Sequence, residues 1–410
     1  MPGREAETVA AVDVGTSKVL VAVAAPEEDG LRVLGVGRAP SGGVRRGAVV
    51  DLAAASSAIA AAAERARRVA GVPLPPVLLG SAGGHFVAGN RQADLRFDPP
   101  AEVEDAHIRQ LLADVRGGEL PAGYQAVHAI PREYVVDGYE GSVRPEGMAA
   151  ARLGLRAHVV ACQSTLLRNL YRAAADAGLE VRDFAVAALA AAEAVLTDEE
   201  RVRGVLLLDA GGGCTQWTAV VGGESVASGV VAMGGAHITA DLAAGLGLDL
   251  GAAEDVKVRH ADAGADPAST AALEWLDALL PEAARGRSPV TAGAFAEMVR
   301  ARVEETLEPV AQALRDLDLE GALPAGAVLT GGASRLRGLE AAALRALGMP
   351  VRRRGAAGSA GPLGTPECAA VVGLLQFAAR PHAGGRRLAP LGGRLRSGGR
   401  PRWWPFGSRG

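Results

Sequence analysis

The chain has 410 residues, 49% apolar and 22% charged, a globular composition with room for two to four domains. Its 43 basic and 46 acidic residues give a net charge of −3, which provides no overall basic field for nucleic acid. Cys162, Cys214 and Cys368 form no CxxC pair, which predicts a reduced intracellular protein. Without a signal-peptide pattern or an apolar run of about eighteen residues, we expect neither secretion nor a membrane span.

Arginine supplies nearly all of the positive charge. Of the 43 basic residues, 41 are arginine, and the two lysines are Lys18 and Lys257. A lysine carries a compact ammonium group rather than a planar fork, so its retention in such a chain suggests a site that needs a point charge. This makes both lysines candidate ligand-binding residues.

Two similar hairpins divide the chain into halves. An apolar strand, Thr8–Gly15, ends in an aspartate and a glycine turn and is followed by a second strand, Lys18–Ala25. The same plan returns at Val205–Gly213, followed by Thr215–Val221. Such a hairpin exposes backbone N–H groups at its tip. We therefore expect two similar domains that face a shared cleft.

The remaining elements alternate as in an α/β protein, with a more polar, proline-richer inserted subdomain from about Gly84 to Ala157. The expected helices are Asp51–Ala70 (capped by Asp51), Val103–Val115, Gln163–Ala177, an alanine-rich helix up to Thr197, Ile238–Gly245, Ala252–Ala261, Ala292–Leu317, Ser334–Leu347 and Pro366–Ala379. The expected strands are Pro76–Ser81, Gln125–Ala129, Arg132–Asp137, Ala149–Leu155, Glu180–Ala187 and Ala327–Thr330. Asp262–Pro289 and the residues after Ala379 are expected to be loop or linker.

The first hairpin turn has the residues of a phosphate-binding loop. Gly15 permits the tight turn, and exposed N–H groups with the hydroxyls of Thr16 and Ser17 can surround a phosphate. Lys18 would contact the β- and γ-phosphates, and Asp13 would hold water on a bound Mg²⁺. An Asp-Gly hairpin with a surface lysine is the plain structural alternative.

Two further glycine motifs follow. Consecutive glycines let the backbone approach a polyphosphate closely, although a flexible structural turn would also explain them. A strand that runs into two glycines and a helix start could hold the adenosine side of a nucleotide. The second motif comprises Asp209, Gly211, Gly212, Gly213, Cys214 and Thr215, and the third comprises Leu329, Thr330, Gly331, Gly332, Ala333 and Ser334.

In this order the three motifs resemble the phosphate-1, phosphate-2 and adenosine motifs of the actin, Hsp70 and sugar-kinase ATPase superfamily. Further motifs resemble the bacterial cell-division family FtsA, and this resemblance runs from Val9 to about Phe377. The stretch His128–Leu155 closely resembles the HVLPQEYxxDxxEGIxNPxGMxGxRL pattern of that family's subdomain 1C. Val195–Glu200 and Ala253–Lys257 resemble its VLTEDE and AExxK segments.

The resemblance implies an α/β, actin-like two-domain ATPase fold with ribonuclease H-like halves and an inserted SHS2-type subdomain. It assigns 7–83 and 161–204 to subdomain 1A, 84–160 to 1C, 205–235 and 308–379 to 2A, 236–307 to 2B, and 380–410 to a linker and tail. It also implies binding of ATP and Mg²⁺, with Asp13 and Asp209 holding the metal through water. Gly234, Gly235, Glu254 and Lys257 would contact the nucleotide. His237 follows Gly234-Gly235-Ala236, so it is a candidate for a position near the base, with a packing or surface role as the alternative.

Two departures from the family pattern bear on hydrolysis. Cys214-Thr215-Gln216 replaces the usual Thr-Asp ending of the second phosphate motif, and Ala187-Ala188 stands where relatives often have Glu-Pro. Only Asp13 and Gln216 remain as candidate catalytic residues, and a glutamine can position water but cannot take a proton. Because losing such a group costs about 10²–10⁴-fold in rate, we expect ATP binding with weak or absent hydrolysis.

The C-terminal tail is electrostatically distinct, since residues 380–410 carry eight arginines and no acidic residue. The same segment contains Trp403, Trp404 and Phe406, and tryptophan prefers the headgroup zone of a bilayer. The resemblance implies a tail that binds anionic inner-membrane lipids. Interrupting glycines and prolines leave a disordered, solubilising tail as the alternative.

The resemblance also implies partners and a location. The family's partner is the tubulin-like protein FtsZ, whose C-terminal peptide docks on subdomain 2B, and Arg302 and Glu305 match residues that contact it. Actin-like self-assembly into head-to-tail filaments, other divisome proteins, and a peripheral position on the cytoplasmic face of the inner membrane at the septum are implied too. A pilus-assembly actin homologue and a small-molecule kinase are the alternative functions. A kinase would need a carboxylate base, against which Gln216 and Ala187 argue.

Overall fold

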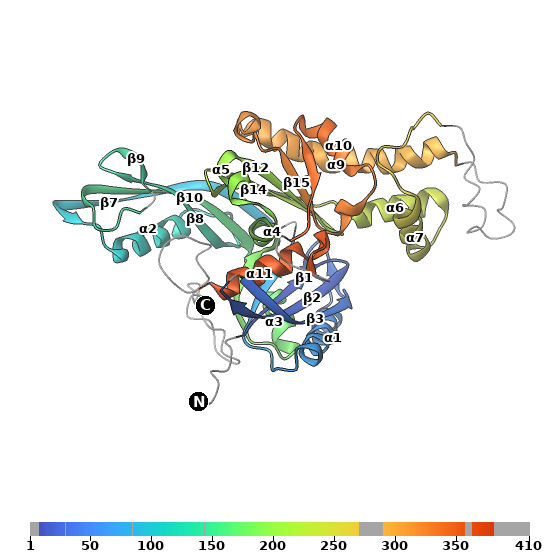
Figure 1. Ribbon diagram of the computed structural model, residues 1–410, viewed down its shortest axis with the longest axis horizontal. Helices are drawn as coiled ribbons and strands as arrows, with labels where there is room; N and C mark the ends of the chain where they lie inside the picture. The colour runs from blue at the N-terminus through green and yellow to red at the C-terminus, as the bar shows by residue number, and fades with distance from the viewer. Residues whose placement is uncertain are drawn as a thin grey trace, which may run out of the picture.

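The computed structural model describes residues 8–28, 30–83, 85–142, 144–269, 290–356 and 363–380. Two five-stranded sheets and a separate four-stranded sheet form its framework (Figure 1). Most of the predicted loop Asp262–Pro289 and nearly all of the predicted tail lie outside the described residues.

The first hairpin lies in the middle of the first sheet, whose strand order is β11-β6-β1-β2-β3. Strand β1 pairs antiparallel with β2 and parallel with β6, and β6 pairs parallel with β11. The strands span Val9–Val14 (β1), Lys18–Glu27 (β2), Gly30–Pro40 (β3), Val77–Ser81 (β6) and Val181–Val186 (β11). A short ribbon, Val44–Arg45 (β4) with Ala48–Val49 (β5), follows β3.

The second sheet repeats this topology. Its order is β14-β13-β12-β15-β16, with β12 antiparallel to β13 and parallel to β15. The strands span Val205–Ala210 (β12), Thr215–Val221 (β13), Glu224–Val231 (β14), Ala327–Thr330 (β15) and Val351–Arg353 (β16). The two similar halves that the hairpin pattern predicted are therefore confirmed.

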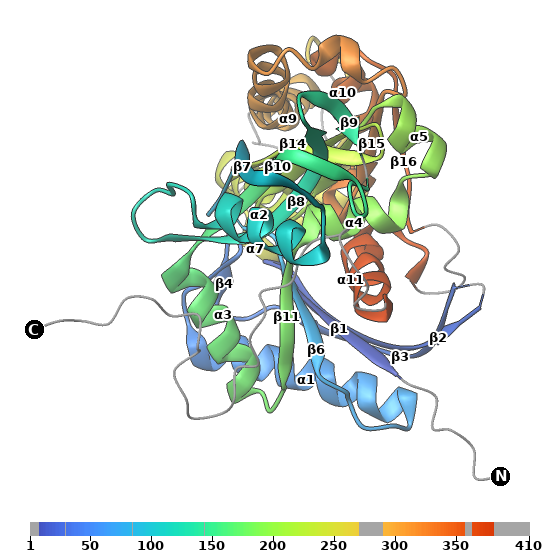
Figure 2. The same cartoon turned by 90° about the vertical axis from the view of Figure 1, so that its left-hand side faces the viewer.

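The central strands alternate their side chains between two buried faces, because helices cover both sides of each sheet. In β1, Ala10 and Val12 face the α1–α3 layer, whereas Val9 and Ala11 face α4 and α11. The same α4–α11 layer also packs against the second sheet, so one core cluster joins the two halves (Figure 2). The helices of these layers are Leu52–Ala70 (α1), Ser164–Asp176 (α3), Ala187–Val195 (α4) and Ala369–Ala379 (α11).

The outer face of the second sheet is covered by helices from the second half. Their apolar side chains form one buried cluster with Leu206 and Leu208 of β12. The helices are Gly235–Leu246 (α6), Leu250–His260 (α7), Ala292–Asp316 (α9) and Leu339–Leu347 (α10). The predicted helix from Ser334 is wrong at its start, because a short 3₁₀ helix, Gly332–Arg335 (η3), comes first and α10 follows Gly338, whose φ is +72°.

The inserted subdomain is a four-stranded sheet of order β7-β10-β8-β9 with α2 packed against it (Figure 1). Its elements are Phe86–Glu102 (β7), Asp105–Gly117 (α2), Tyr124–Val136 (β8), Tyr139–Ser142 (β9) and Ala149–Gln163 (β10). The prediction of two strands in place of β8 is wrong, because the strand continues through Pro131. Proline is tolerated there since β9 pairs with β8 only at Tyr134 and Val136, and the β8–β10 register shifts beside Pro131.

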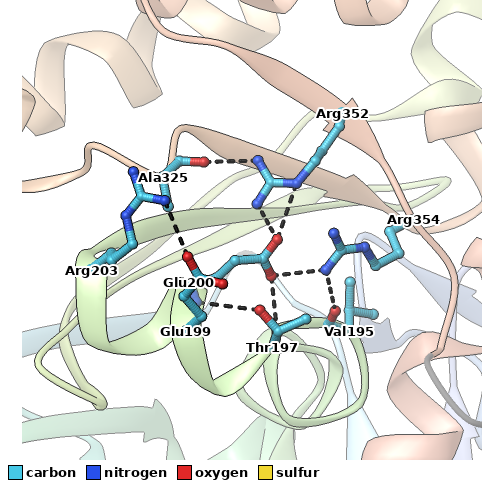
Figure 3. A network of polar contacts seen from close by, with 8 residues as sticks. All are labelled: Val195, Thr197, Glu199, Glu200, Arg203, Ala325, Arg352 and Arg354. Atoms are coloured by element: carbon cyan, nitrogen blue, oxygen red, sulfur yellow. Dashed lines mark hydrogen bonds and ion pairs between the residues drawn. The ribbon is translucent and has the colours of Figure 1, made fainter.

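A charged network fastens the segment between the halves to the second sheet. Glu200, in helix α5 (Asp198–Arg203), pairs with Arg352 and Arg354 from the end of β16 (Figure 3). Arg354 also donates to the Val195 carbonyl at the end of α4, at 3.2 Å. Hydrogen bonds from the Thr197 N–H and both arginines outweigh burial and lower the pKa of Glu200 to about 2.

Candidate nucleotide site

The tips of the two hairpins meet. Each has the same turn, in which Gly15 N–H donates to Lys18 O and Gly211 N–H donates to Cys214 O, both at 3.0 Å. A Cβ on Gly212 would lie 2.1 Å from Ser17 Oγ, and one on Gly213 would lie 2.4 Å from Thr16 Oγ1. A Cβ at either position would displace one of these hydroxyls, so the two tips approach each other closely. The structure thus brings together the residues of the two predicted phosphate motifs.

The start of α6 joins the same cluster. Gly235 N–H donates to Gly211 O at 3.0 Å, and Ala236 N–H donates to Gly212 O at 2.8 Å. A Cβ on Gly234 would lie 2.4 Å from Gly211 O. These hydrogen bonds engage the first N–H groups of α6 and fix its N-terminal turn to the second hairpin.

The predicted adenosine motif lies beside them. Gly331 has a φ of +83°, and a Cβ there would lie 2.4 Å from Asp209 Oδ1, so glycine is needed at this turn. Gly332 begins η3. Ser334 is fully buried, and its hydroxyl donates to Gly331 O at 2.7 Å, so it holds the turn rather than facing a ligand.

Asp13 and Asp209 are buried at the ends of β1 and β12. Burial and then the charge of Asp209 raise the pKa of Asp13 to about 7, while Lys18 opposes the shift. Burial raises the pKa of Asp209 to about 6, again opposed by Lys18. Such a pair suits a nearby divalent cation, because each carboxylate lacks compensating positive charge. In the described part of the chain no three His, Cys, Asp or Glu side chains group as metal ligands, so phosphate oxygens and water would complete the shell.

Lys18 is held at the edge of this cluster. Its ammonium group donates to the Glu367 carbonyl oxygen at 2.8 Å, and burial lowers its pKa. Glu367 belongs to a short 3₁₀ helix, Pro366–Cys368 (η5), before α11. The Glu367 carboxylate pairs with Arg335 of the second half at 3.1 Å and with Arg38 of the first half at 3.7 Å.

The sequence did not reveal this role of Glu367. Pro366 and an acidic side chain at a helix start mark its local structure. Its two partners are among 41 arginines, however, so nothing in the sequence singles out Arg38 and Arg335.

Glu254 and Lys257 lie on α7 against the first turn of α6. Lys257 Nζ donates to Gly235 O at 3.1 Å, to Thr239 Oγ1 at 2.9 Å and to Glu254 Oε2 at 2.6 Å. His237 Nδ1 accepts the Gly234 N–H at 3.1 Å, so that ring nitrogen stabilises the start of α6. Lys257 therefore lies against Gly235, whose own N–H donates to Gly211 of the second hairpin.

The remaining motif residues lie in β13 or immediately before it. Cys214 is buried, and Thr215 Oγ1 donates to the Met233 carbonyl at 3.0 Å. Gln216 is 2% exposed, and its Oε1 accepts the Ala188 N–H at 3.0 Å. That hydrogen bond holds the Gln216 side chain against the start of α4.

The other predicted residues lie away from the hairpins or outside the described residues. Arg302 makes a two-pronged pair with Asp241 of α6, at 2.7 and 2.9 Å, and a 2.7 Å contact with Glu305. Glu305 is largely exposed, whereas Arg302 is mostly covered. Trp403, Trp404 and Phe406 lie outside the described residues. Among the described helices, none is long and apolar enough to span a bilayer.

Comparison with known proteins identifies relatives of both the fold and the insertion. A family model described as "Cell division protein FtsA" matches residues 206–373, and one described as "SHS2 domain inserted in FTSA" matches residues 83–161. Cell division protein FtsA of Pseudomonas aeruginosa is 33% identical over 347 residues, which cover 84% of this chain and 82% of that protein.

Two solved structures share the fold at low sequence identity. The PilM–PilN type IV pilus biogenesis complex matches with a TM-score of 0.65 and 18% identity, covering 91% of this chain and 99% of that chain. MreB5 of Spiroplasma citri bound to ADP matches with a TM-score of 0.52 and 14% identity, covering 91% and 96%. The predicted α/β actin-like fold is therefore confirmed.

Proposed function

Because this chain belongs to the FtsA family of bacterial cell-division proteins, we propose that it is a nucleotide-gated tether that attaches FtsZ filaments to the cytoplasmic face of the inner membrane at the septum. The observation that carries the nucleotide part of this proposal is the meeting of the two glycine hairpins beside two buried aspartates.

The proposed ligand is MgATP, held between the halves. N–H groups and hydroxyls of the first hairpin, Gly15 to Ser17, would surround one part of the triphosphate, and Gly211 to Cys214 the other. Mg²⁺ would neutralise phosphate charge, with Asp13 and Asp209 orienting its water. Lys18 would leave the Glu367 carbonyl to meet the phosphates, and Lys257 would face the ribose and base.

We further propose that MgATP acts as a clamp rather than as a fuel. A ligand that contacts both halves favours the closed form by its higher affinity for that form, and closure would support head-to-tail self-assembly. Since Gln216 replaces a carboxylate, phosphate release should stay below about 1 s⁻¹, slower than an ordinary enzyme. Faster steady-state release would contradict this part of the proposal.

Membrane attachment is assigned to the tail on sequence grounds. Eight arginines in residues 380–410 can each contribute about 1 kcal/mol near an anionic leaflet, and Trp403, Trp404 and Phe406 can enter the headgroup zone. Residues of α9 are assigned to the FtsZ C-terminal peptide, with Arg302 and Glu305 at its contact, and other divisome proteins would bind the assembled tether. Arg302→Ala should weaken peptide binding at least about tenfold, or about 1.4 kcal/mol, while Arg300→Ala on the same helix should not.

The test is co-sedimentation of the full chain with FtsZ filaments and anionic liposomes, with and without MgATP. The proposal expects FtsZ to pellet with liposomes only when this chain is present, and more strongly with MgATP. A chain that ends at Arg380 should bind FtsZ but leave it in the supernatant. If FtsZ pellets equally with the shortened chain, the tail has no part in tethering.

A further inference from the structure

Helix α4 begins with N–H groups that its own residues cannot satisfy. The first N–H groups of a helix lack intrahelical partners, and a polar side chain at the N-cap normally accepts one of them. Here the N-cap is Val186, followed by Ala187 and Ala188, none of which has a polar side chain. The start of α4 is nevertheless buried, so its N–H groups need acceptors from elsewhere.

Those acceptors come from two other parts of the molecule. Gln216 Oε1, two residues beyond the second hairpin turn, accepts the Ala188 N–H at 3.0 Å. His128 Nε2, from β8 of the inserted subdomain, accepts the Val186 N–H at 3.0 Å. Gln216 and His128 are 2% and 1% exposed. The start of α4 is thus capped from the second half on one side and from the insertion on the other.

A second contact joins the inserted subdomain to the second half without involving α4. His158 of β10 contacts Asn90 Oδ1 of β7 at 3.0 Å and Ser228 Oγ of β14 at 2.8 Å. A small cavity lies between these contacts, and its lining includes Val160, Ala188, Gln216 and Ser228. The region around α4 can therefore shift slightly without displacing closely packed side chains.

We infer that this group, which we call the α4 joint (His128, Val186, Ala188 and Gln216), transmits nucleotide binding at the second hairpin to the inserted subdomain. When the hairpin moves, Gln216 moves with it, and the Ala188 N–H follows because a buried N–H without an acceptor is costly. The Val186 N–H moves with α4 and draws His128 and β8 along for the same reason. His128 and Gln216 are positioning residues here, since neither needs to touch the ligand.

The coupling is reciprocal. If MgATP changes the conformation of the inserted sheet, a macromolecule that binds that sheet changes the affinity for MgATP by the same factor. A partner bound to the insertion would then respond to whether MgATP is bound, and would itself change the affinity for MgATP. This inference rests on the proposed MgATP site.

Helix α4 packs tightly against α11, so it moves as a unit. A Cβ on Gly373 of α11 would lie 1.7 Å from the Ala190 carbonyl oxygen, so the two helices are in backbone contact at this crossing. Displacement at the N-terminus of α4 is therefore carried along the helix rather than absorbed by loose side chains.

The test is hydrogen–deuterium exchange of the full chain with and without saturating MgATP, after calorimetry has measured binding. In the wild type, MgATP should slow exchange in β8 by at least about twofold. His128→Met, which removes the acceptor, should bind MgATP but lose the effect in β8. His128→Gln, which places an acceptor at similar reach, should restore it.

Ser228→Ala is the matched control, because it removes the His158–Ser228 contact between the inserted sheet and the second half and leaves the α4 joint intact. It should keep the MgATP effect in β8. Loss of the effect in Ser228→Ala but not in His128→Met would overturn the inference. Calorimetric binding of MgATP with unchanged hydrogen exchange in β8 of the wild type would refute this inference alone. If calorimetry shows no MgATP binding, the proposed nucleotide site is refuted as well. If His128→Met does not fold, retention of the MgATP effect in Ser228→Ala supports the inference, and loss of the effect in that variant overturns it.

Discussion

Gly234→Ala tests whether the second hairpin and α6 form one rigid ligand-binding unit. The new Cβ would lie 2.4 Å from Gly211 O, 2.8 Å from Gly212 O and 3.0 Å from Cys214 N. All three are main-chain atoms, so no side chain can swing away to relieve the clash. Since ordinary separations are about 3.5 Å, the hairpin and α6 must part by about 1 Å.

Two consequences follow from that displacement. Overpacking of this kind costs about 1–3 kcal/mol of stability, which urea unfolding would measure. Displacing the second hairpin, which the proposed site places against the triphosphate, should weaken MgATP binding at least about tenfold, or about 1.4 kcal/mol, which isothermal titration calorimetry would measure.

Gly89→Ala is the control for Gly234→Ala. No described atom lies within 4 Å of its added Cβ, and its stability should stay within about 0.5 kcal/mol of wild type. Wild-type affinity for MgATP in Gly234→Ala would refute the assignment of this contact to the nucleotide site.

Three further predictions concern the supporting structure. Glu200→Gln should cost about 1.5–3 kcal/mol at pH 7, because it weakens charged hydrogen bonds to two arginines. Because the pKa of Glu200 is lowered, this stabilisation is present above the unfolded-state pKa of about 4.5 and is lost as the pH falls toward about 2. Urea unfolding should therefore show that the difference in unfolding free energy between wild type and Glu200→Gln shrinks between about pH 4.5 and about pH 2. A difference that does not change with pH would contradict the pairing. Gly373→Ala should destabilise the chain by at least about 3 kcal/mol in thermal or urea unfolding, because its Cβ would overlap the Ala190 carbonyl, and a neutral result would refute the close helix crossing. Arg302→Ala should lower the free energy of unfolding by about 1–3 kcal/mol, because it leaves Asp241 without its ion-pair partner. If Arg300→Ala lowers it equally, the Arg302–Asp241 pair has no particular structural role.

The hairpins and the duplicated halves could be predicted from sequence because their signals are local. An apolar run, an aspartate and a glycine turn specify a hairpin wherever they occur, and β1–β2 and β12–β13 begin within a residue or two of the expected positions. Asp51, predicted as the cap of α1, accepts the Ala54 N–H at 3.0 Å. The order and spacing of residues along the chain were enough to predict these hairpins and this helix cap.

Features that depend on distant partners could not be predicted. Strand β7 was missed because most of its side chains are exposed, its apolar alternation is limited to Ala93, Leu95 and Phe97, and its sequence includes Pro99 and Pro100. The continuity of β8 through Pro131 depends on pairing with β10. The hydrogen bond that occupies Gln216 comes from Ala188, 28 residues away, and no sequence spacing indicates it.

The central claim is that the two hairpin tips hold a triphosphate between the halves. The most direct measurement is a crystal structure of the full chain with a non-hydrolysable MgATP analogue. The account predicts phosphate density bounded by Gly15–Lys18 on one side and Gly211–Cys214 on the other, with the metal near Asp13 and Asp209. An analogue that binds in solution but lies elsewhere in the crystal, with the hairpin tips still in contact, would contradict it.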